Sequence, residues 1–151
     1  MRRLAPYLLA AWALLWAGWV AAPYFEARFR PIRVEQEIQV VERGSRLCWV
    51  WHSTKLRAVA SDDIDVHLVV GGDWPNRYSV AVFNRDTGMP WSRSGAMGVG
   101  THDLPFCVLL PPHVTDRDDL VVEQTAWFPG WLGLWRVPLV IPPVTSRGAK
   151  P

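Results

Sequence analysis

The chain has 151 residues, of which 50% are apolar and 20% are charged, so it has room for one domain and one appendage and is more apolar than an average soluble domain. Its formal net charge is +2; Arg2 and Arg3 precede an apolar N-terminal run, and the other 14 basic residues balance all 14 acidic ones. The part of the chain after that run is therefore neutral, and its charge does not favour a nucleic-acid partner.

The first predicted element is a transmembrane helix over residues 4–25. This run contains no charged residue in 22 positions, and about 20 residues suffice to cross the hydrocarbon core of a bilayer. It also lacks the polar face of a soluble helix. Trp12, Trp16 and Trp19 are typical of a resident membrane helix, whereas a small-x-small cleavage site is poor. We predict an uncleaved signal anchor, with a cleaved signal peptide as the alternative; in a further hypothesis, these tryptophans pack against a partner helix.

Basic residues flank both ends of this helix. Residues 1–3 are predicted to be cytoplasmic, residues 26–31 are predicted to be a juxtamembrane linker, and the flanking arginines are Arg2, Arg3, Arg28, Arg30 and Arg33. They are expected to contact lipid headgroups, but their numbers give no clear orientation by the positive-inside rule. Two cysteines in a small β-rich domain favour an oxidising compartment. We therefore predict a cytoplasmic N-terminus and an extracytoplasmic domain in the inner or plasma membrane.

Residues 32–144 are predicted to form one all-β domain. Short apolar runs with a period of two alternate with turn residues, and no helical periodicity is found there. The predicted strands lie near residues 34–40, 46–52, 64–70, 77–84, 104–110, 120–127 and 134–141. About seven short strands are typical of an immunoglobulin-like β-sandwich, which is the predicted fold. A long Gly- and Ser-rich loop is expected over residues 85–102 and a disordered tail over residues 145–151.

Cys48 and Cys107 lie 59 positions apart, on the second and fifth predicted strands. This separation resembles the inter-sheet disulfide of immunoglobulin domains, although the tryptophan usual on the following strand is missing and Pro105 stands where a tyrosine is usual. We predict a disulfide, with two free buried thiols as the alternative; without a C-x-x-C motif, a redox-active pair is disfavoured. If Cys48 points between the sheets, strand periodicity turns Trp49 and Trp51 away from the core, and we favour this arrangement over the reverse.

Carboxylates are the densest candidate metal ligands. They occur in two turn-like stretches that could lie at one end of a sandwich and together hold calcium: Asp62, Asp63 and Asp65, and Asp116, Asp118 and Asp119. No D-x-D-x-D-G loop is present, so solvated turn aspartates are the favoured interpretation. The four histidines stand at no zinc-ligand spacing.

Three tryptophans in turn-like sequence are candidate binding residues: Trp74, Trp91 and Trp131. They are suited to contact a partner, a sugar or the bilayer surface, and the alternative is that each packs over a sheet edge. No catalytic signature occurs, so we predict neither an enzyme nor a cofactor.

These features together predict a single-pass, membrane-anchored binding or structural module without catalytic activity. Its expected partners are the lipid bilayer, through residues 4–25, and a protein of the cell envelope. The alternative is a ligand- or cation-binding, possibly enzymatic, β domain that uses the aspartates. The excess of arginine over lysine suggests a GC-rich bacterial or phage genome.

Overall fold

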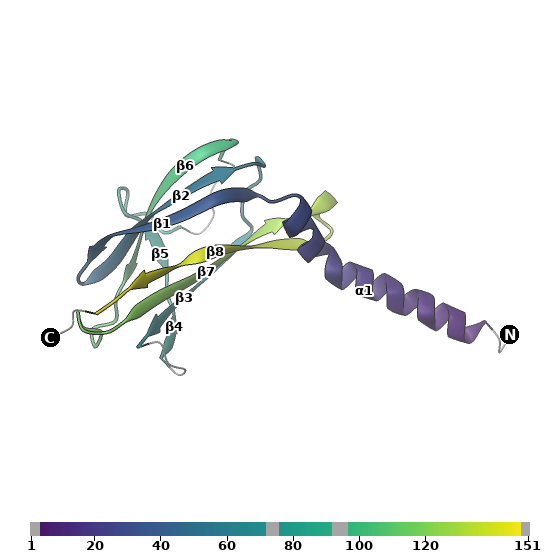
Figure 1. Ribbon diagram of the computed structural model, residues 1–151, viewed down its shortest axis with the longest axis horizontal. Helices are drawn as coiled ribbons and strands as arrows, with labels where there is room; N and C mark the ends of the chain where they lie inside the picture. Colours follow the sequence, from purple (N-terminus) through teal and green to yellow (C-terminus); the bar gives the residue numbers. More distant parts are fainter. Residues whose placement is uncertain (1–3, 72–75, 92–96, 149–151) are drawn as a thin grey trace.

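The computed structural model describes residues 4–71, 76–91 and 97–148. A helix projects from one end of a β domain, and the C-terminus lies at the opposite end (Figure 1). The helix is α1 (Ala5–Phe29), and a short 3-10 turn, η1 (Trp131–Gly133), lies late in the chain. The strands are β1 (Arg33–Arg43), β2 (Arg46–Lys55), β3 (Asp63–Val70), β4 (Arg77–Ser79), β5 (Val82–Asn84), β6 (Gly100–Leu109), β7 (Leu120–Pro129) and β8 (Arg136–Ser146).

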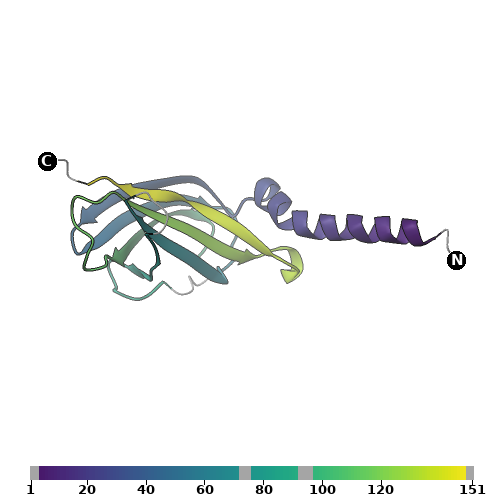
Figure 2. The ribbon, with the colours of Figure 1, turned by 90° about the horizontal axis from the view of Figure 1, so that it is seen from below.

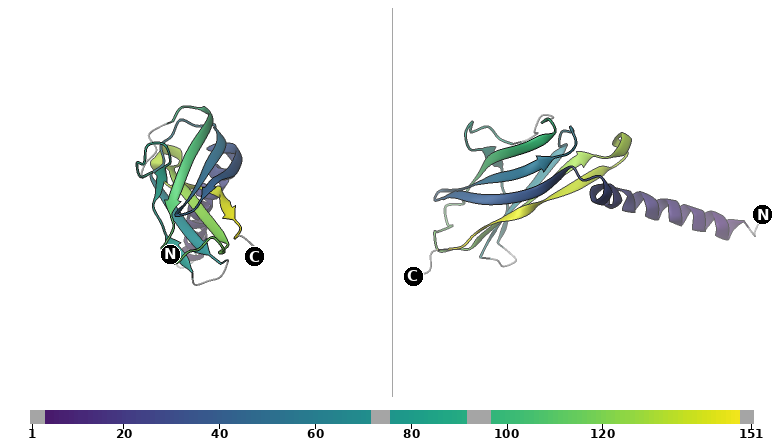
Figure 3. Two further views of the ribbon diagram at one scale, coloured as in Figure 1. Left: turned by 90° about the vertical axis from the view of Figure 1, so that its left-hand side faces the viewer. Right: turned by 45° about the horizontal axis from the view of Figure 1, so that its top comes forward.

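The strands form two antiparallel sheets of four strands each. Their orders are β1-β2-β6-β5 and β4-β3-β7-β8. The sheets face each other as two layers, with the helix continuing roughly along their length (Figures 2 and 3). The prediction of a mostly β domain after one apolar helix is confirmed.

The run predicted as one strand over residues 77–84 is instead two short strands. β4 pairs with β3, whereas β5 pairs with β6 in the other sheet. The chain therefore changes sheet at residues 80–81, and the described residues hold eight strands where seven were predicted. The alternation of Tyr78, Val80 and Val82 runs through both pieces, so the sequence pattern continues across the crossing.

The tryptophans of β2 fill the core between the sheets. Trp49 is fully buried and Trp51 is 1% exposed, and both belong to one buried apolar cluster with residues of the opposite sheet. Because successive side chains alternate along a strand, Cys48 points away from this cluster. The favoured prediction, with Cys48 inward, is therefore wrong.

Cys48 and Cys107 are direct partners on adjacent strands of one sheet. Their sulfur atoms lie 2.02 Å apart, at disulfide distance, and their Cα atoms are 4.1 Å apart. The pair joins β2 to β6 on the face turned away from the core. The expectation that it would bridge two sheets is wrong, because the predicted second and fifth strands are neighbours in the same sheet.

Helix α1 continues beyond the predicted span. It ends at Phe29, so most of the predicted linker over residues 26–31 is helical. At the other end of the chain, Thr145 and Ser146 pair with β7, so the first residues of the predicted disordered tail belong to a strand. Residues 149–151 lie outside the described residues. The helix is long and apolar enough to cross a membrane by length and composition.

Candidate functional site at the junction of helix and β domain

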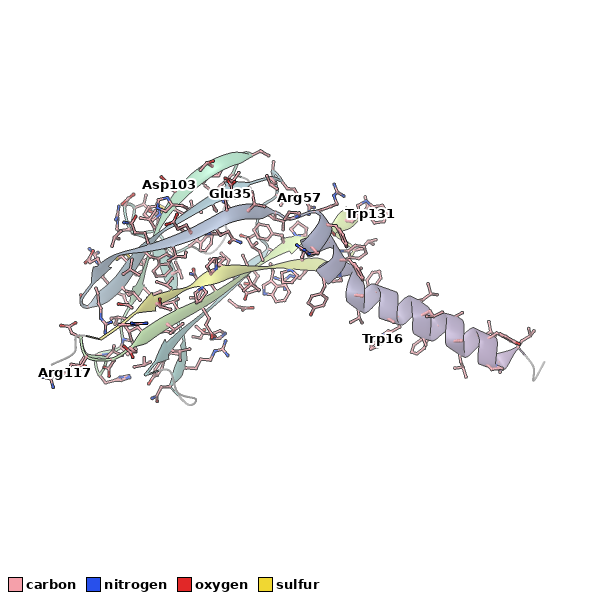
Figure 4. The ribbon with its side chains drawn as sticks, viewed as in Figure 1. Trp16, Glu35, Arg57, Asp103, Arg117 and Trp131 are labelled. Carbon is pink, nitrogen blue, oxygen red and sulfur yellow. A yellow bond between two sulfur atoms is a disulfide. The ribbon has the colours of Figure 1, made fainter. Side chains whose placement is uncertain are left out.

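A single carboxylate joins the helix to the β domain. Glu26 is 8% exposed, and its Oε1 accepts a hydrogen bond from Arg57 Nη1 at 2.9 Å. Its Oε2 accepts one from the Trp131 backbone N–H at 2.9 Å and one from Trp135 Nε1 at 2.8 Å. Oε1 therefore binds the segment after β2, and Oε2 binds the turn between β7 and β8. Figure 4 shows Arg57 and Trp131 at this junction.

The position of Glu26 is electrostatically unfavourable within the helix itself. It lies in the last turn of α1, where the backbone carbonyls carry partial negative charge and a carboxylate is destabilising. The Arg57 guanidinium and the two N–H donors offset this repulsion. The sequence signal for this contact is a lone acidic residue directly after a long uncharged run. Glu26, Arg57 and Trp135 were not among the predicted site residues.

The turn between β7 and β8, residues 130–135, lies against the last turns of the helix. We call this segment the β7–β8 tip. The ring centroids of Trp135 and Trp19 are 5.7 Å apart in an edge-to-face contact. Trp19 and Glu26 are two helical turns apart and so share a helix face. The tip therefore follows the helix from Glu26 to the level of Trp19, inside the predicted membrane span.

Beside these contacts, an open groove of about 390 Å³ lies between the tip and the helix. Its walls are mainly apolar, and its lining residues are Ala22, Phe25, Glu26, Phe29, Arg30, Trp131 and Trp135. A second hollow of about 340 Å³ lies along the β4-β3-β7-β8 sheet; it includes the Arg77–Glu123 ion pair and Val140, which is 69% exposed. The first hollow is mainly apolar and adjoins α1, while the lining of the second includes charged side chains.

The junction predicts a sharp steric effect at Gly130. A Cβ atom placed there would lie 2.4 Å from two ring atoms of Trp135 and 3.0 Å from Glu26 Oε2. Gly130→Ala must therefore displace the Trp135 ring and weaken its hydrogen bond to Glu26. We expect the helix–domain connection to open more often, so that trypsin cleaves after Arg28 about tenfold faster in detergent, which corresponds to about 1.4 kcal/mol.

Gly44→Ala is the matched control for this prediction. Gly44 lies in the β1–β2 turn, its φ is not positive, and an added Cβ meets nothing within 4 Å. Its cleavage rate should equal that of the wild type. Equal rates for both variants would show that the Trp135–Glu26 contact does not hold the junction closed.

The two aspartate clusters do not come together. Asp63 pairs with Trp127 at one end of β7, whereas Asp119 directly precedes the other end, about 24 Å away at the usual rise per strand residue. The expectation that the clusters could share one end of the sandwich is therefore wrong. The paired strands are antiparallel, so their preceding turns lie at opposite ends.

The aspartates with hydrogen-bond partners serve the local structure. Asp118 accepts bonds from the Thr115 N–H and hydroxyl, which lower the pKa of Asp118. Asp65 accepts from Trp127 Nε1, and Asp119 accepts from the Gly148 N–H. Within residues 4–71, 76–91 and 97–148, no group of three or more His, Cys, Asp or Glu side chains is placed to hold a metal ion. Asp62 and Asp116, the remaining predicted positions, take part in no such group.

The three candidate tryptophans have different surroundings. Trp91 is half-buried and stacks on Phe106, with ring centroids 4.2 Å apart, so it packs on the core as the alternative interpretation expected. Trp131 is 54% exposed in the β7–β8 tip. Trp74 lies outside the described residues.

The predicted membrane-flanking arginines also differ in their exposure. Arg28 and Arg30 are exposed at the end of α1. Arg33 is only 6% exposed: its guanidinium lies over the Trp51 ring, and its Nη1 donates to Ser53 Oγ at 2.7 Å. The prediction that Arg33 contacts headgroups is wrong, because β1 begins at this residue and turns its side chain inward. Arg2 and Arg3 lie outside the described residues.

A second cation is buried beside Arg33. Lys55 pairs with Arg33 across β1 and β2 and is fully buried, and its Nζ donates to the Val59 carbonyl at 2.7 Å. Burial lowers the pKa of the Lys55 ammonium, and the nearby Arg33 charge lowers it further. Burial likewise lowers the pKa of Arg33. The charged form of Lys55 is therefore less stable in the folded domain than in the unfolded chain.

This lowered pKa predicts a pH dependence of stability. Between the lowered pKa and the ordinary value of 10.5, the unfolded chain binds more protons than the folded domain, so the free energy of unfolding rises with pH. Lys55→Met removes the titrating ammonium and with it this rise. Urea unfolding of both proteins at a series of pH values up to 10.5 measures the rise and its loss. Parallel profiles for wild type and variant would contradict the prediction.

In comparisons with known proteins, no protein-family model and no curated protein matches this chain.

Proposed function

We propose that the protein is a single-pass, membrane-anchored module without catalytic activity, which binds or supports another component of the cell envelope. The observation that carries this proposal is the junction at Glu26. A helix that exposes apolar side chains on all sides continues directly into the β domain, and buried hydrogen bonds to Glu26 hold the two parts together. Such a helix is stable in lipid, and the junction then holds the domain at the membrane surface.

The proposed topology places the N-terminus in the cytoplasm and the β domain outside it, at the inner or plasma membrane. The two cysteines at disulfide distance support this orientation, because disulfides persist in oxidising compartments. The exposed Arg28 and Arg30 would then lie in the outer headgroup layer.

We further propose that the domain is immunoglobulin-like. In chain order, β1 to β8 correspond to strands A, B, C, C′, D, E, F and G of that fold, whose sheets have the orders A-B-E-D and C′-C-F-G. The two sheets here have the same orders. The cysteines would then lie on strands B and E of one sheet, where immunoglobulin domains have them on B and F.

Membrane fractionation and protease accessibility test this proposal. In a bacterial host, the full chain should stay in the membrane pellet after carbonate extraction, and protease added to spheroplasts should digest the β domain. Release by carbonate would overturn the anchor. Digestion only in inverted vesicles would overturn the orientation.

The envelope partner is tested separately by photo-crosslinking. A photoreactive residue in place of Val140, in the hollow along the β4-β3-β7-β8 sheet, should give a discrete crosslinked species in native membranes. Leu109, which is 66% exposed on β6 of the other sheet, is the control position. Crosslinks of equal yield at both positions would indicate random collisions and no specific binding face.

A further inference from the structure

The depth of the β7–β8 tip follows from its contact with Trp19. Trp19 lies six residues before Phe25, where the uncharged run ends, and at 1.5 Å per residue this is about 9 Å along the helix. The Trp135 ring is packed against Trp19, with centroids 5.7 Å apart. If residues 4–25 span the hydrocarbon, which is the proposed function on which this inference depends, Trp135 is at the level of the outer leaflet.

The composition and exposure of the tip suit that environment. Residues 130–135 read Gly-Trp-Leu-Gly-Leu-Trp and contain no charge. Trp131 is 54% exposed, Leu132 77% and Leu134 45%. Tryptophan is enriched where a membrane meets water, and leucine gains free energy on entering the acyl layer. Arg30, exposed at the end of the adjacent helix, is positioned to meet lipid phosphates.

The backbone of the tip gives an independent argument. Leu132 has a φ of +51°, in the left-handed region. A side chain there costs about 1–2 kcal/mol relative to the right-handed region, and glycine avoids that cost. The Leu132 side chain is 77% exposed, so its burial among the described residues offsets little of this cost. A contact outside the chain would account for an apolar residue at this position.

The groove between tip and helix indicates what that contact is. It opens on the same helix surface that lipid would surround, and Phe25 and Phe29 form one of its walls, 61% and 75% exposed. The groove is therefore continuous with the lipid-facing surface of α1. Acyl chains around the helix would meet the apolar walls at Ala22, Phe25 and Trp135 first, while Glu26 and Arg30 line the end of the groove toward the β domain.

We propose that the β7–β8 tip is a second membrane contact of this protein, inserted into the outer leaflet of the bilayer that α1 spans. Lipid fills the groove between tip and helix. The domain is then held at two places, at the helix and at the tip, and its orientation relative to the membrane surface is restricted.

Site-specific fluorescence in liposomes tests the insertion. The full chain carrying Leu132→Cys is labelled with an environment-sensitive NBD probe without reductant, so that Cys48 and Cys107 remain paired, and is reconstituted into phosphatidylcholine–phosphatidylglycerol vesicles. We expect blue-shifted emission, loss of emission with nitroxide lipids labelled near the headgroup, and protection from aqueous iodide. Leu134→Cys provides a second position in case labelling at residue 132 disturbs the turn.

Leu109→Cys is the control, because this side chain is 66% exposed on the last residue of β6, far from the helix. Its probe should be quenched by iodide and not by lipid. Iodide quenching at residues 132 and 134 in protein that floats with the vesicles would overturn the inserted tip and leave the anchor intact. Failure to float would overturn the anchor itself. A blue shift that depends on the protein-to-lipid ratio, without lipid quenching, would assign the tip to a second copy and overturn the lipid contact.

Discussion

Replacing both Cys48 and Cys107 with alanine lowers the free energy of unfolding of the β domain by about 4 kcal/mol. The bond closes a loop of 59 positions, and removing it returns conformational entropy to the unfolded chain. Both residues are fully buried, so alanine is preferred to serine, which would bury an unpaired hydroxyl. Urea unfolding in detergent, followed by tryptophan fluorescence, measures the change.

Reduction of the wild type provides the control for this experiment. With dithiothreitol present, the wild type should unfold at a urea concentration close to that of the variant. The unfolding of the variant should not change with reductant. A loss below about 1 kcal/mol, or reaction of the unreduced wild type with maleimide, would show that the two sulfurs are not bonded in the native protein.

Trp49→Ala should destabilise the domain by about 3–5 kcal/mol. The Trp49 side chain is fully buried between the sheets and lies against Phe106, with ring centroids 6.2 Å apart. Its Nε1 has no hydrogen-bond partner among the described residues, so the loss is one of packing and leaves no polar group unpaired. The same unfolding experiment measures the effect.

Trp127→Ala is the matched control for this large effect. Trp127 lies on β7 and is half-buried on the face away from the core, where its Nε1 donates to Asp65 and Arg136 lies over its ring. Because this ring is partly solvated, we expect the substitution to lower the free energy of unfolding by about 1 kcal/mol. A larger loss at Trp127 than at Trp49 would place Trp49 on the wrong face of its sheet.

The choice of face at β2 illustrates what the strand pattern leaves open. Both faces of residues 46–52 are apolar, since Cys48 and Val50 alternate with Trp49 and Trp51. The neighbouring strand decides between them: Trp49 pairs with Phe106 and Leu47 with Val108, so the bulkier pairs share one face. Periodicity predicts which residues share a face of the strand. Which face is buried depends on the size of the side chains that the neighbouring strand places on it.

The order of the strands in the sheets is a second feature that the sequence does not predict, as the aspartates and the junction show. Strand positions were predicted well because half-buried strands alternate visibly, whereas pairing and sheet changes leave no local signal. The aspartate turns were therefore expected at one end, and the crossing at residues 80–81 was missed. The contact of Glu26 with Trp131 spans 105 positions, so sequence spacing alone does not predict it.

The helical continuation through Glu26 has a mechanical consequence. Only residues 30–32 separate α1 from β1, and Glu26 bonds the helix to the domain, so the domain would follow the tilt of α1 if the helix spans a membrane. Transmembrane helices adjust to bilayer thickness by changing tilt, and a domain about 37 Å long, the span of β8, would move its far end by about 6 Å for each 10° or so of tilt. The position of the C-terminal end relative to the membrane surface would then depend on the local thickness of the bilayer.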